Sequence, residues 1–331
     1  AGAPAGDRVK PERPPLGQRP FRAHTLGIMK ALPHPAAALA VPLLALLWGL
    51  NWPAVRVVLS WWSPWTLRAV GMGAGALLLF LLAVSRGESL RVSADQRWRV
   101  VVSSLFTIVG FNLCTAFAQL GGSTARAAIV TFTMPVWAVL MAWLVIGERP
   151  DRWRLGAVLL GVAGLGLLAT PLLAAGVSPR GPLFALGAGL SWAAGTVFVK
   201  RWPARVAPVA GTAWQLLIGA TVSALGWAAF GSASSYPAAL AWSATAFWIA
   251  LSFHVVLATA LAYVIWFDIV ARLPAGVAAL GTLLIPVVGV AGAMLLLGER
   301  PNASDLGGFA LIIAAAALAL LAPRAGAPSP R

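Results

Sequence analysis

The chain of 331 residues is 60% hydrophobic and only 10% charged, whereas soluble domains carry about 25% charged residues. This composition excludes an ordinary soluble fold, because its few polar side chains could not cover so much apolar surface. The net charge of +15 does not indicate a nucleic-acid partner, since the 24 Lys and Arg are scattered through short segments between apolar runs. A single cysteine, Cys114, and three histidines without ligand spacing argue against disulfides and metal sites. We therefore expect a membrane protein without metal or cofactor.

The chain begins with a segment, 1–35, that is rich in Pro, Gly and Arg and lacks the cleavage site of a secretory signal. We expect it to be a disordered cytoplasmic tail. Apolar runs then repeat to residue 323, and a bilayer-spanning helix needs roughly 20 apolar residues. The sequence therefore predicts ten spans and a C-terminal tail, 324–331. The predicted spans are 36–58, 64–84, 98–120, 124–146, 153–171, 182–200, 208–230, 246–270, 275–297 and 303–323.

Basic residues are distributed unequally between the two sides of such a bundle. Nineteen of the 24 Lys and Arg lie in the two tails and in alternate connections, whereas Arg126, Arg180 and Arg300 lie in the others. Cytoplasmic segments are enriched in Lys and Arg. We therefore expect a multi-pass protein of the bacterial inner (cytoplasmic) membrane with both termini in the cytoplasm.

The sequence contains an internal repeat. The segment GERPDRWRLGAVLLG that begins at Gly147 recurs as GERPNASDLGGFALI at Gly298, 151 residues later, and an offset of 144 residues relates Trp48 to Trp192. The repeated units are 36–171 and 182–323. Five spans in each unit would place the second unit upside down relative to the first, and inverted repeats are typical of transporters that open a central site alternately to each side. The predicted fold class is an all-α polytopic membrane protein with ten transmembrane helices in two inverted five-helix repeats. Duplication in a membrane scaffold or enzyme is the alternative.

The ten-span plan, the stretches 135–149 and 286–300 that run from Pro to Gly-Glu-Arg, and the Trp-bearing first helix of each half carry a family resemblance. Over 36–323 the chain resembles the EamA branch of the drug/metabolite transporter superfamily. The resemblance implies helices around a central cavity and includes exporters of amino acids and other metabolites. A multidrug or cation exporter of the same fold is the alternative. An intramembrane enzyme is less consistent with spans that lack paired carboxylates, His-x-x-x-His and Gly-x-Ser-x-Gly.

The first span contains polar and aromatic side chains at mid-membrane depth. Trp48 and Asn51 share a helix face, and Trp192 is the counterpart of Trp48 in the second half. We expect these side chains to line the cavity, with plain packing as the alternative for the two indoles.

Each half also contains a proline within its fourth span. Pro135 and Pro286 would free the carbonyl groups of Thr131 and Thr282, four residues earlier. A freed carbonyl in the membrane needs a partner. We predict that both threonine positions face the cavity; a packing kink satisfied by the threonine hydroxyls is the alternative.

Three ionisable residues fall within spans. Arg68 is a candidate for attracting a carboxylate, and the alternative is that its side chain extends to the membrane surface. His254 and Asp268 are the candidate carriers of a coupling proton. A neutral buried histidine, and an ion pair between Asp268 and Arg272, are the alternatives.

Neutral polar residues recur on the third, seventh and eighth spans: Asn112, Thr115, Gln119, Trp214, Gln215 and Tyr263. Together they indicate a pocket for an amphipathic or zwitterionic metabolite. The predicted substrate-binding residues are Trp48, Asn51, Arg68, Asn112, Thr131, Trp192, Trp214, Gln215, Tyr263 and Thr282. We expect a monomeric secondary transporter, surrounded by membrane lipids, that exports such a small molecule by alternating access.

Overall fold

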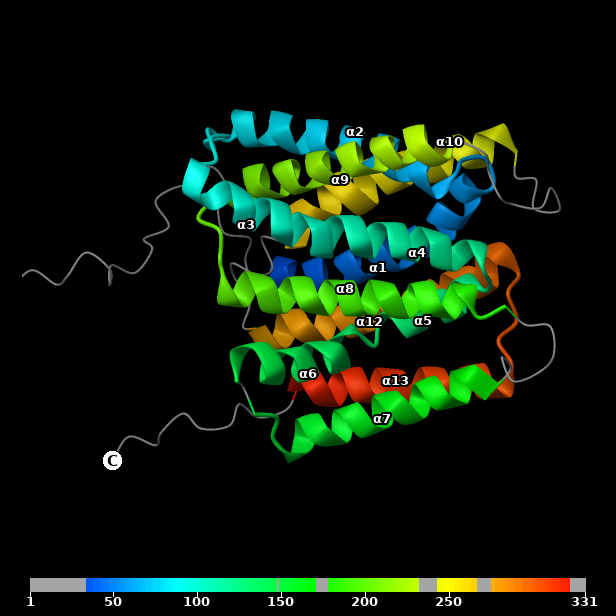
Figure 1. The fold of residues 1–331 in the computed structure, drawn as a ribbon. Coiled ribbons are helices and arrows are strands. Elements are labelled where there is room, and N and C mark those ends of the chain that lie inside the picture. The colour runs from blue at the N-terminus through cyan, green and yellow to red at the C-terminus, as the bar shows by residue number, and fades with distance from the viewer. Residues whose placement is uncertain (1–33, 148, 171–177, 232–242, 267–274, 322–331) are drawn as a thin grey trace, which may run out of the picture.

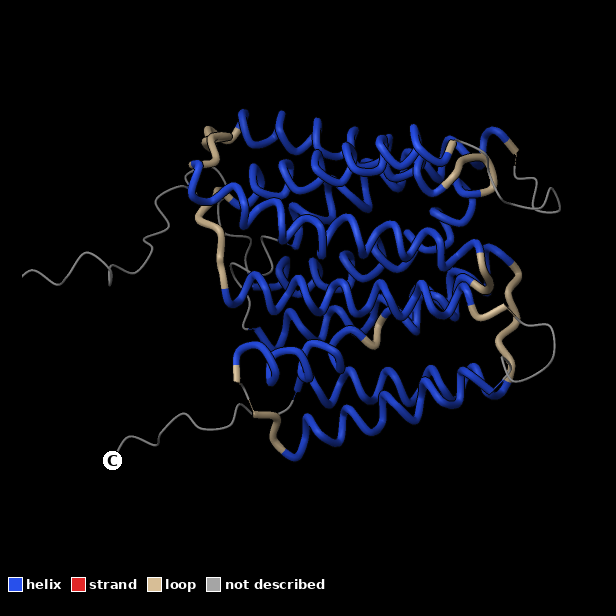
Figure 2. Tube along the Cα trace, in the orientation of Figure 1, coloured by secondary structure: helices blue, strands red, loops and turns tan. Residues whose placement is uncertain are grey.

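The computed structural model describes residues 34–147, 149–170, 178–231, 243–266 and 275–321. Within these residues all regular structure is helical, and the helices run side by side with their connections at two ends (Figures 1 and 2). Helices satisfy their own backbone hydrogen-bonding groups, as lipid requires. The helices are α1 (His34–Leu59), α2 (Pro64–Ser85), α3 (Ala94–Ser104), η1 (Leu105–Gly110), α4 (Phe111–Leu120), α5 (Thr124–Thr131), α6 (Met134–Ile146), α7 (Arg152–Ala169), α8 (Arg180–Arg201), α9 (Pro208–Phe230), α10 (Ala244–Ser252), η4 (Phe253–Leu261), α12 (Ala275–Leu297) and α13 (Ala303–Leu321).

Over the described residues, the predicted spans coincide with helical segments to within a few residues. Pro64 and Pro208 stand in the first turns of α2 and α9, where a missing N–H removes no hydrogen bond. Among the described residues, seven helical stretches are long and apolar enough to cross a membrane, and Leu284–Leu297 and Ala303–Leu318 are shorter apolar helices. The protein is therefore a multi-pass α-helical membrane protein.

The fourth span differs from the prediction. Instead of one helix kinked at Pro135, the helix stops after Thr131, and Pro135 is the second residue of the new helix α6. A proline in the first turn leaves no hydrogen bond unmade, so the predicted cause of a freed Thr131 carbonyl is absent. The break is closed locally, because the Thr133 hydroxyl donates to the Val130 carbonyl at 2.7 Å.

The third helix of each half contains a π-helical segment, η1 in the first half and η4 in the second. Such segments are rare and are often found at functional sites. Each accepts a hydrogen bond from the first helix of a half. The Ser191 hydroxyl donates to the Phe106 carbonyl in η1 at 2.8 Å, and the Trp48 indole donates to the Ala258 carbonyl in η4 at 3.1 Å.

Other features also recur at the two offsets found in the sequence. Gly87 and Gly231 both have positive φ, as do Gly147 and Gly298, a conformation that favours glycine. Helix α1 packs on α12, and α8, its counterpart, packs on α5 and α6. The α6–α7 and α12–α13 connections lie at opposite ends of the bundle (Figure 1).

Helices α4 and α8 meet backbone to backbone where α4 ends and α8 begins. A Cβ atom built on Gly121 would lie 2.5 Å from the Gly181 nitrogen, and one built on Gly181 would lie 2.8 Å from the Gly121 carbonyl carbon. Small residues permit such close approach in membrane bundles, where dispersion contacts supply much of the helix association. This crossing therefore depends on the absence of both side chains.

Candidate central cavity

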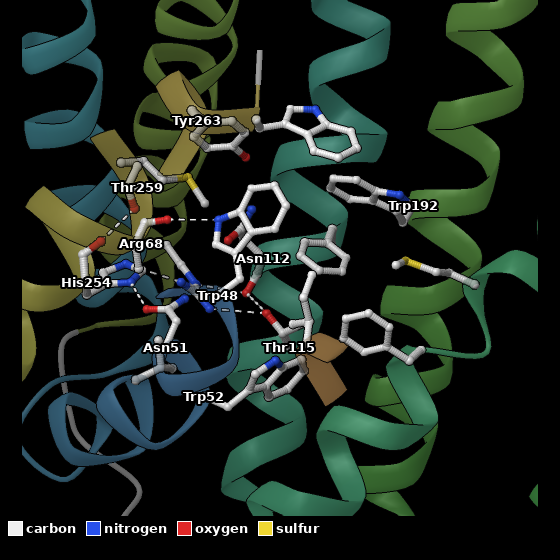
Figure 3. A pocket seen from close by; sticks show the side chains of 18 of the residues that line it. Trp48, Asn51, Trp52, Arg68, Asn112, Thr115, Trp192, His254, Thr259 and Tyr263 are labelled. Carbon is white, nitrogen blue, oxygen red and sulfur yellow. Dashed lines mark hydrogen bonds between the residues drawn. The ribbon is translucent and has the colours of Figure 1, made fainter. Parts of the chain in front are cut away.

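A cavity of about 510 Å³ lies inside the bundle, a volume suited to a small organic solute. Helices from both halves line it, including α1, α2, α4, α6, α8 and η4. Figure 3 shows polar side chains gathered on one side of it and aromatic rings around them. Its aromatic walls include Trp48, Trp52, Phe111, Trp192, Tyr263 and Trp266.

The aromatic side chains support one another. The ring of Trp48 packs edge-on against Tyr263, at 6.0 Å between centroids, and at a tilt against Trp266, at 5.7 Å. Phe111 packs on Trp192 at 4.8 Å. Because the indole N–H of Trp48 is bonded to η4, this side chain presents mainly its ring to the cavity. Such rigid faces suit the apolar part of a solute.

Arg68 is the one permanently charged side chain among the described residues that line the cavity. It lies one turn from the start of α2, is only 3% exposed and turns into the bundle instead of extending to the membrane surface. Its Nε donates to the Asn112 carbonyl at 2.9 Å, and one terminal nitrogen donates to the Thr115 hydroxyl at 3.2 Å. Within the described residues, no carboxylate forms a salt bridge with it.

The other terminal nitrogen of Arg68 faces His254 in η4. Its Nη1 lies 3.5 Å from Nε2 of the imidazole, and Nδ1 of the same ring lies 2.8 Å from Oδ1 of Asn51 in α1 (Figure 3). One polar cluster therefore joins α1, α2, α4 and η4. These elements come from both halves of the chain.

The structure brings most of the predicted site residues to this cavity. Those that line it are Trp48, Asn51, Arg68, Asn112, Trp192, Tyr263 and the predicted proton carrier His254. Thr115 and Gln119, noted as polar pocket residues, line it as well. The side chain of Thr282, and Asp268 with Arg272, lie outside the residues that the structure describes.

Three predicted binding residues lie elsewhere, which corrects the prediction. Thr131, the last residue of α5, is fully buried against α8, and its hydroxyl donates to the Ala127 carbonyl. Trp214 donates to the Leu90 carbonyl and Gln215 to the Ser103 hydroxyl, so these two residues bind α9 to the region before and within α3. Their sequence positions did not show which face of the helix each side chain occupies.

Several residues that line the cavity were not predicted from the sequence, notably Thr259 and Trp266. Thr259 precedes Tyr263 by four residues and Trp266 follows it by three, so helical spacing from Tyr263 would have placed all three on one face. Phe111 and Phe132 had no such signal, because isolated phenylalanines in an apolar span resemble packing residues.

A second polar cluster closes the end of the bundle where α5 begins and α12 ends. The Glu299 carboxylate accepts hydrogen bonds from the Ser123 hydroxyl and from the backbone N–H groups of Thr124 and Ala125, at 2.6–2.9 Å. Nearby, Arg126 forms a salt bridge of 2.6 Å with Asp305 in α13. The Glu299 carboxylate therefore caps the N-terminus of α5, where a negative charge is favourable.

Replacing Glu299 with glutamine is therefore expected to lower the thermal stability of the detergent-solubilised protein. The amide keeps the size of the side chain but loses the charge, and its NH2 group cannot accept the hydrogen bonds made to one of the two carboxylate oxygens. We expect a cost of about 1–2 kcal/mol. The melting temperature, measured by loss of monodisperse protein after heating, should fall by a few degrees. The neighbouring exposed Arg300→Gln variant is the control and should melt like the parent. Equal melting of all three proteins would contradict the capping role.

Comparison with known proteins adds to this geometry. The model of the EamA-like transporter family matches residues 35–170 and again residues 179–321. The uncharacterized transporter YvbV of Bacillus subtilis is 31% identical over 287 residues, which cover 86% of this chain and 92% of that protein. A probable amino-acid metabolite efflux pump of Salmonella typhimurium is 28% identical, covering 82% and 90%. A protein solved by crystallography aligns with a TM-score of 0.60 at 25% identity, covering 86% of this chain and 96% of the other. The chain belongs to the EamA-like transporter family.

Proposed function

We propose that this protein is a secondary transporter that exports a small amphipathic or zwitterionic metabolite, with amino acids as the first class to test. The observation that carries the proposal is the buried Arg68 in a cavity with aromatic walls. An uncompensated guanidinium can bind a carboxylate, and the rings can hold an apolar side chain. A site of this charge suits organic cations less well, which places the alternative of a multidrug or cation exporter second.

We propose alternating access between two inverted five-helix halves, ten spans in all. The double match of the family model supports this arrangement, as do the paired π-helical segments and the paired positive-φ glycines. Opposite placement of the α6–α7 and α12–α13 connections is what inversion requires (Figure 1). The functional unit would be a monomer, with the proton as a candidate coupling ion.

Export is the favoured direction. Along the bundle, the cavity reaches from Arg68, near the start of α2, to Thr196 in α8. Thr196 lies five residues before Arg201, at the basic end of α8. At the opposite end, Glu299 and Arg126 tie α12 and α13 to α5. By the positive-inside rule the basic end faces the cytoplasm, so a solute would load from that side. The printed name of the Salmonella relative, an amino-acid metabolite efflux pump, supports the same direction.

Uptake into proteoliposomes tests the function. Labelled amino acids, nucleobases and cationic drugs would be screened with the purified protein, followed by the Trp48→Ala and Arg68→Ala variants. We expect at least one amino acid to be transported and both variants to reduce its rate. Selective transport of cations alone would reject the proposed substrate class. Unchanged transport in both variants would reject the cavity as the binding site.

Labelling of introduced cysteines tests the inverted topology. In a background where Cys114 is replaced by alanine, cysteines at Arg149 and Arg300 should react with an impermeant reagent from opposite sides of the membrane. Reaction of both from one side would contradict inversion.

A further inference from the structure

We propose that His254 is a positioning residue that sets the charge selectivity of the cavity, because it holds the Arg68 guanidinium as a neutral hydrogen-bond acceptor. The guanidinium then keeps its full charge for an anionic group of the solute. This inference rests on the proposed function and deepens it. Of the two roles that the sequence left open for His254, a neutral buried histidine and a proton carrier, the inference adopts the first.

The positions of the neighbouring atoms determine where the imidazole proton lies. A guanidinium can only donate hydrogen bonds, so Nε2 of His254, which faces Arg68 at 3.5 Å, must act as the acceptor and carry no proton. The proton of the neutral ring then lies on Nδ1 and is donated to Oδ1 of Asn51 at 2.8 Å. A second ring proton would point at the guanidinium, which makes a doubly protonated ring unfavourable.

Every described hydrogen-bond partner of the Arg68 guanidinium is uncharged. The acceptors are the Asn112 carbonyl, the Thr115 hydroxyl and the His254 imidazole. They engage three of the five N–H groups, and two remain, the number that a carboxylate accepts in a bidentate pair. A glutamate or aspartate at position 254 would instead form an ion pair with Arg68 and cancel the attraction for an anionic solute.

The local packing is built around this imidazole. Gly71 lies one turn after Arg68 in α2, and a Cβ atom there would approach Nε2 of His254 to 3.0 Å. The absence of that side chain lets the ring lie against α2 beside the arginine. On the other side, the Thr259 hydroxyl donates to the His254 carbonyl at 2.8 Å within η4. Helix α2 thus supplies both the cation and the space for its acceptor.

Charge-selective transport tests the proposal. Proteoliposomes with the parent protein, His254→Gln or His254→Glu would be offered labelled L-leucine and L-phenylalanine and, separately, their carboxamides, which lack the carboxylate. Glutamine can accept from Arg68 and donate to Asn51, so His254→Gln should keep the preference for acid over amide within about threefold. His254→Glu should reduce that preference at least tenfold, on the order of one charge-assisted hydrogen bond. An undiminished preference in His254→Glu, or its equal loss in both variants, would overturn the proposal.

Two further measurements separate this inference from the proposed function. If neither amino acid is transported, the substrate class fails, but stabilisation of the solubilised protein by benzoate over benzamide still tests the anion site. The benzoate preference should survive in His254→Gln and vanish in His254→Glu; its absence in the parent would overturn the inference. Nitrogen-15 NMR of the histidine rings, with His254 assigned from the His254→Gln variant, should show a neutral ring protonated at Nδ1 at neutral pH. A doubly protonated ring would also overturn it.

Discussion

The Arg68→Met variant should transport amino acids on the order of 10- to 100-fold more slowly than the parent, because it removes the charge that binds the carboxylate, worth about 1.5–3 kcal/mol per charged hydrogen bond. Arg68→Lys should be intermediate, since an ammonium keeps the charge but not the planar fork. Initial uptake rates in proteoliposomes over a range of solute concentrations measure both effects. Arg91→Met, at an exposed arginine in the α2–α3 connection, is the control and should behave like the parent.

The same variant should be folded and no less stable. Burying a guanidinium in the membrane costs about 2.5–3.5 kcal/mol at the helix centre, and methionine avoids this cost. The Thr115 hydroxyl and the Asn112 carbonyl stay paired, because the hydroxyl already donates to that carbonyl at 2.9 Å. Among the described partners, Nε2 of His254 alone loses its donor, at a cost comparable with the one avoided. A loss of transport with unchanged melting temperature would therefore indicate a binding role. A variant that fails to fold would show that Arg68 is instead required for the structure.

The second large effect is expected at the crossing of α4 and α8. Gly121→Ala should destabilise the solubilised protein by roughly 1–3 kcal/mol, because its Cβ would press on backbone atoms of Gly181 that no side-chain rotation can move. The backbone of Gly121 has φ of −91°, which alanine adopts freely, so the effect would be purely steric. Melting temperature and yield of monodisperse protein are the measurements.

The adjacent glycine offers a matched control for that experiment. A Cβ atom at Gly122 would meet nothing within 4 Å, and this residue is exposed. Gly122→Ala should therefore melt close to the parent. Equal melting of the two alanine variants would show that the helices separate there at little cost.

The helical segments were predictable because their signals are local. Runs of apolar residues ended by Pro, Gly or charge placed α9 at 208–230 and α2 at its first residue, Pro64. The break after Thr131 was not predictable, since a proline in an apolar run is compatible with a kink or with a new helix start. The π-helical segments were also missed, because no residue pattern distinguishes them from a continuous helix.

Some residues of the candidate site were likewise predictable from the sequence, and others were not. Arg68, His254 and Trp48 could be predicted as site residues because charged, titratable or indole groups are unusual in the membrane interior. The structure places all three at one cavity. Trp214 and Gln215 are also polar groups in an apolar helix. Their side chains, however, donate to the Leu90 carbonyl and to the Ser103 hydroxyl, on the side of α9 that faces α3. In helices that are apolar on every face, hydrophobic periodicity does not reveal which face is inward.

The sequence by itself determined that this chain crosses a membrane many times, that its two halves repeat, and which rare polar side chains the membrane interior must accommodate. These conclusions follow from composition and from the cost of exposing charge or backbone to lipid. Only the tertiary structure decided that Arg68, Asn112, Thr115, His254 and Asn51 form one hydrogen-bonded cluster. Their juxtaposition depends on how α1, α2, α4 and η4 rotate and cross. Those orientations are set by contacts between distant residues, such as the hydrogen bond between Trp48 and Ala258, which are 210 positions apart.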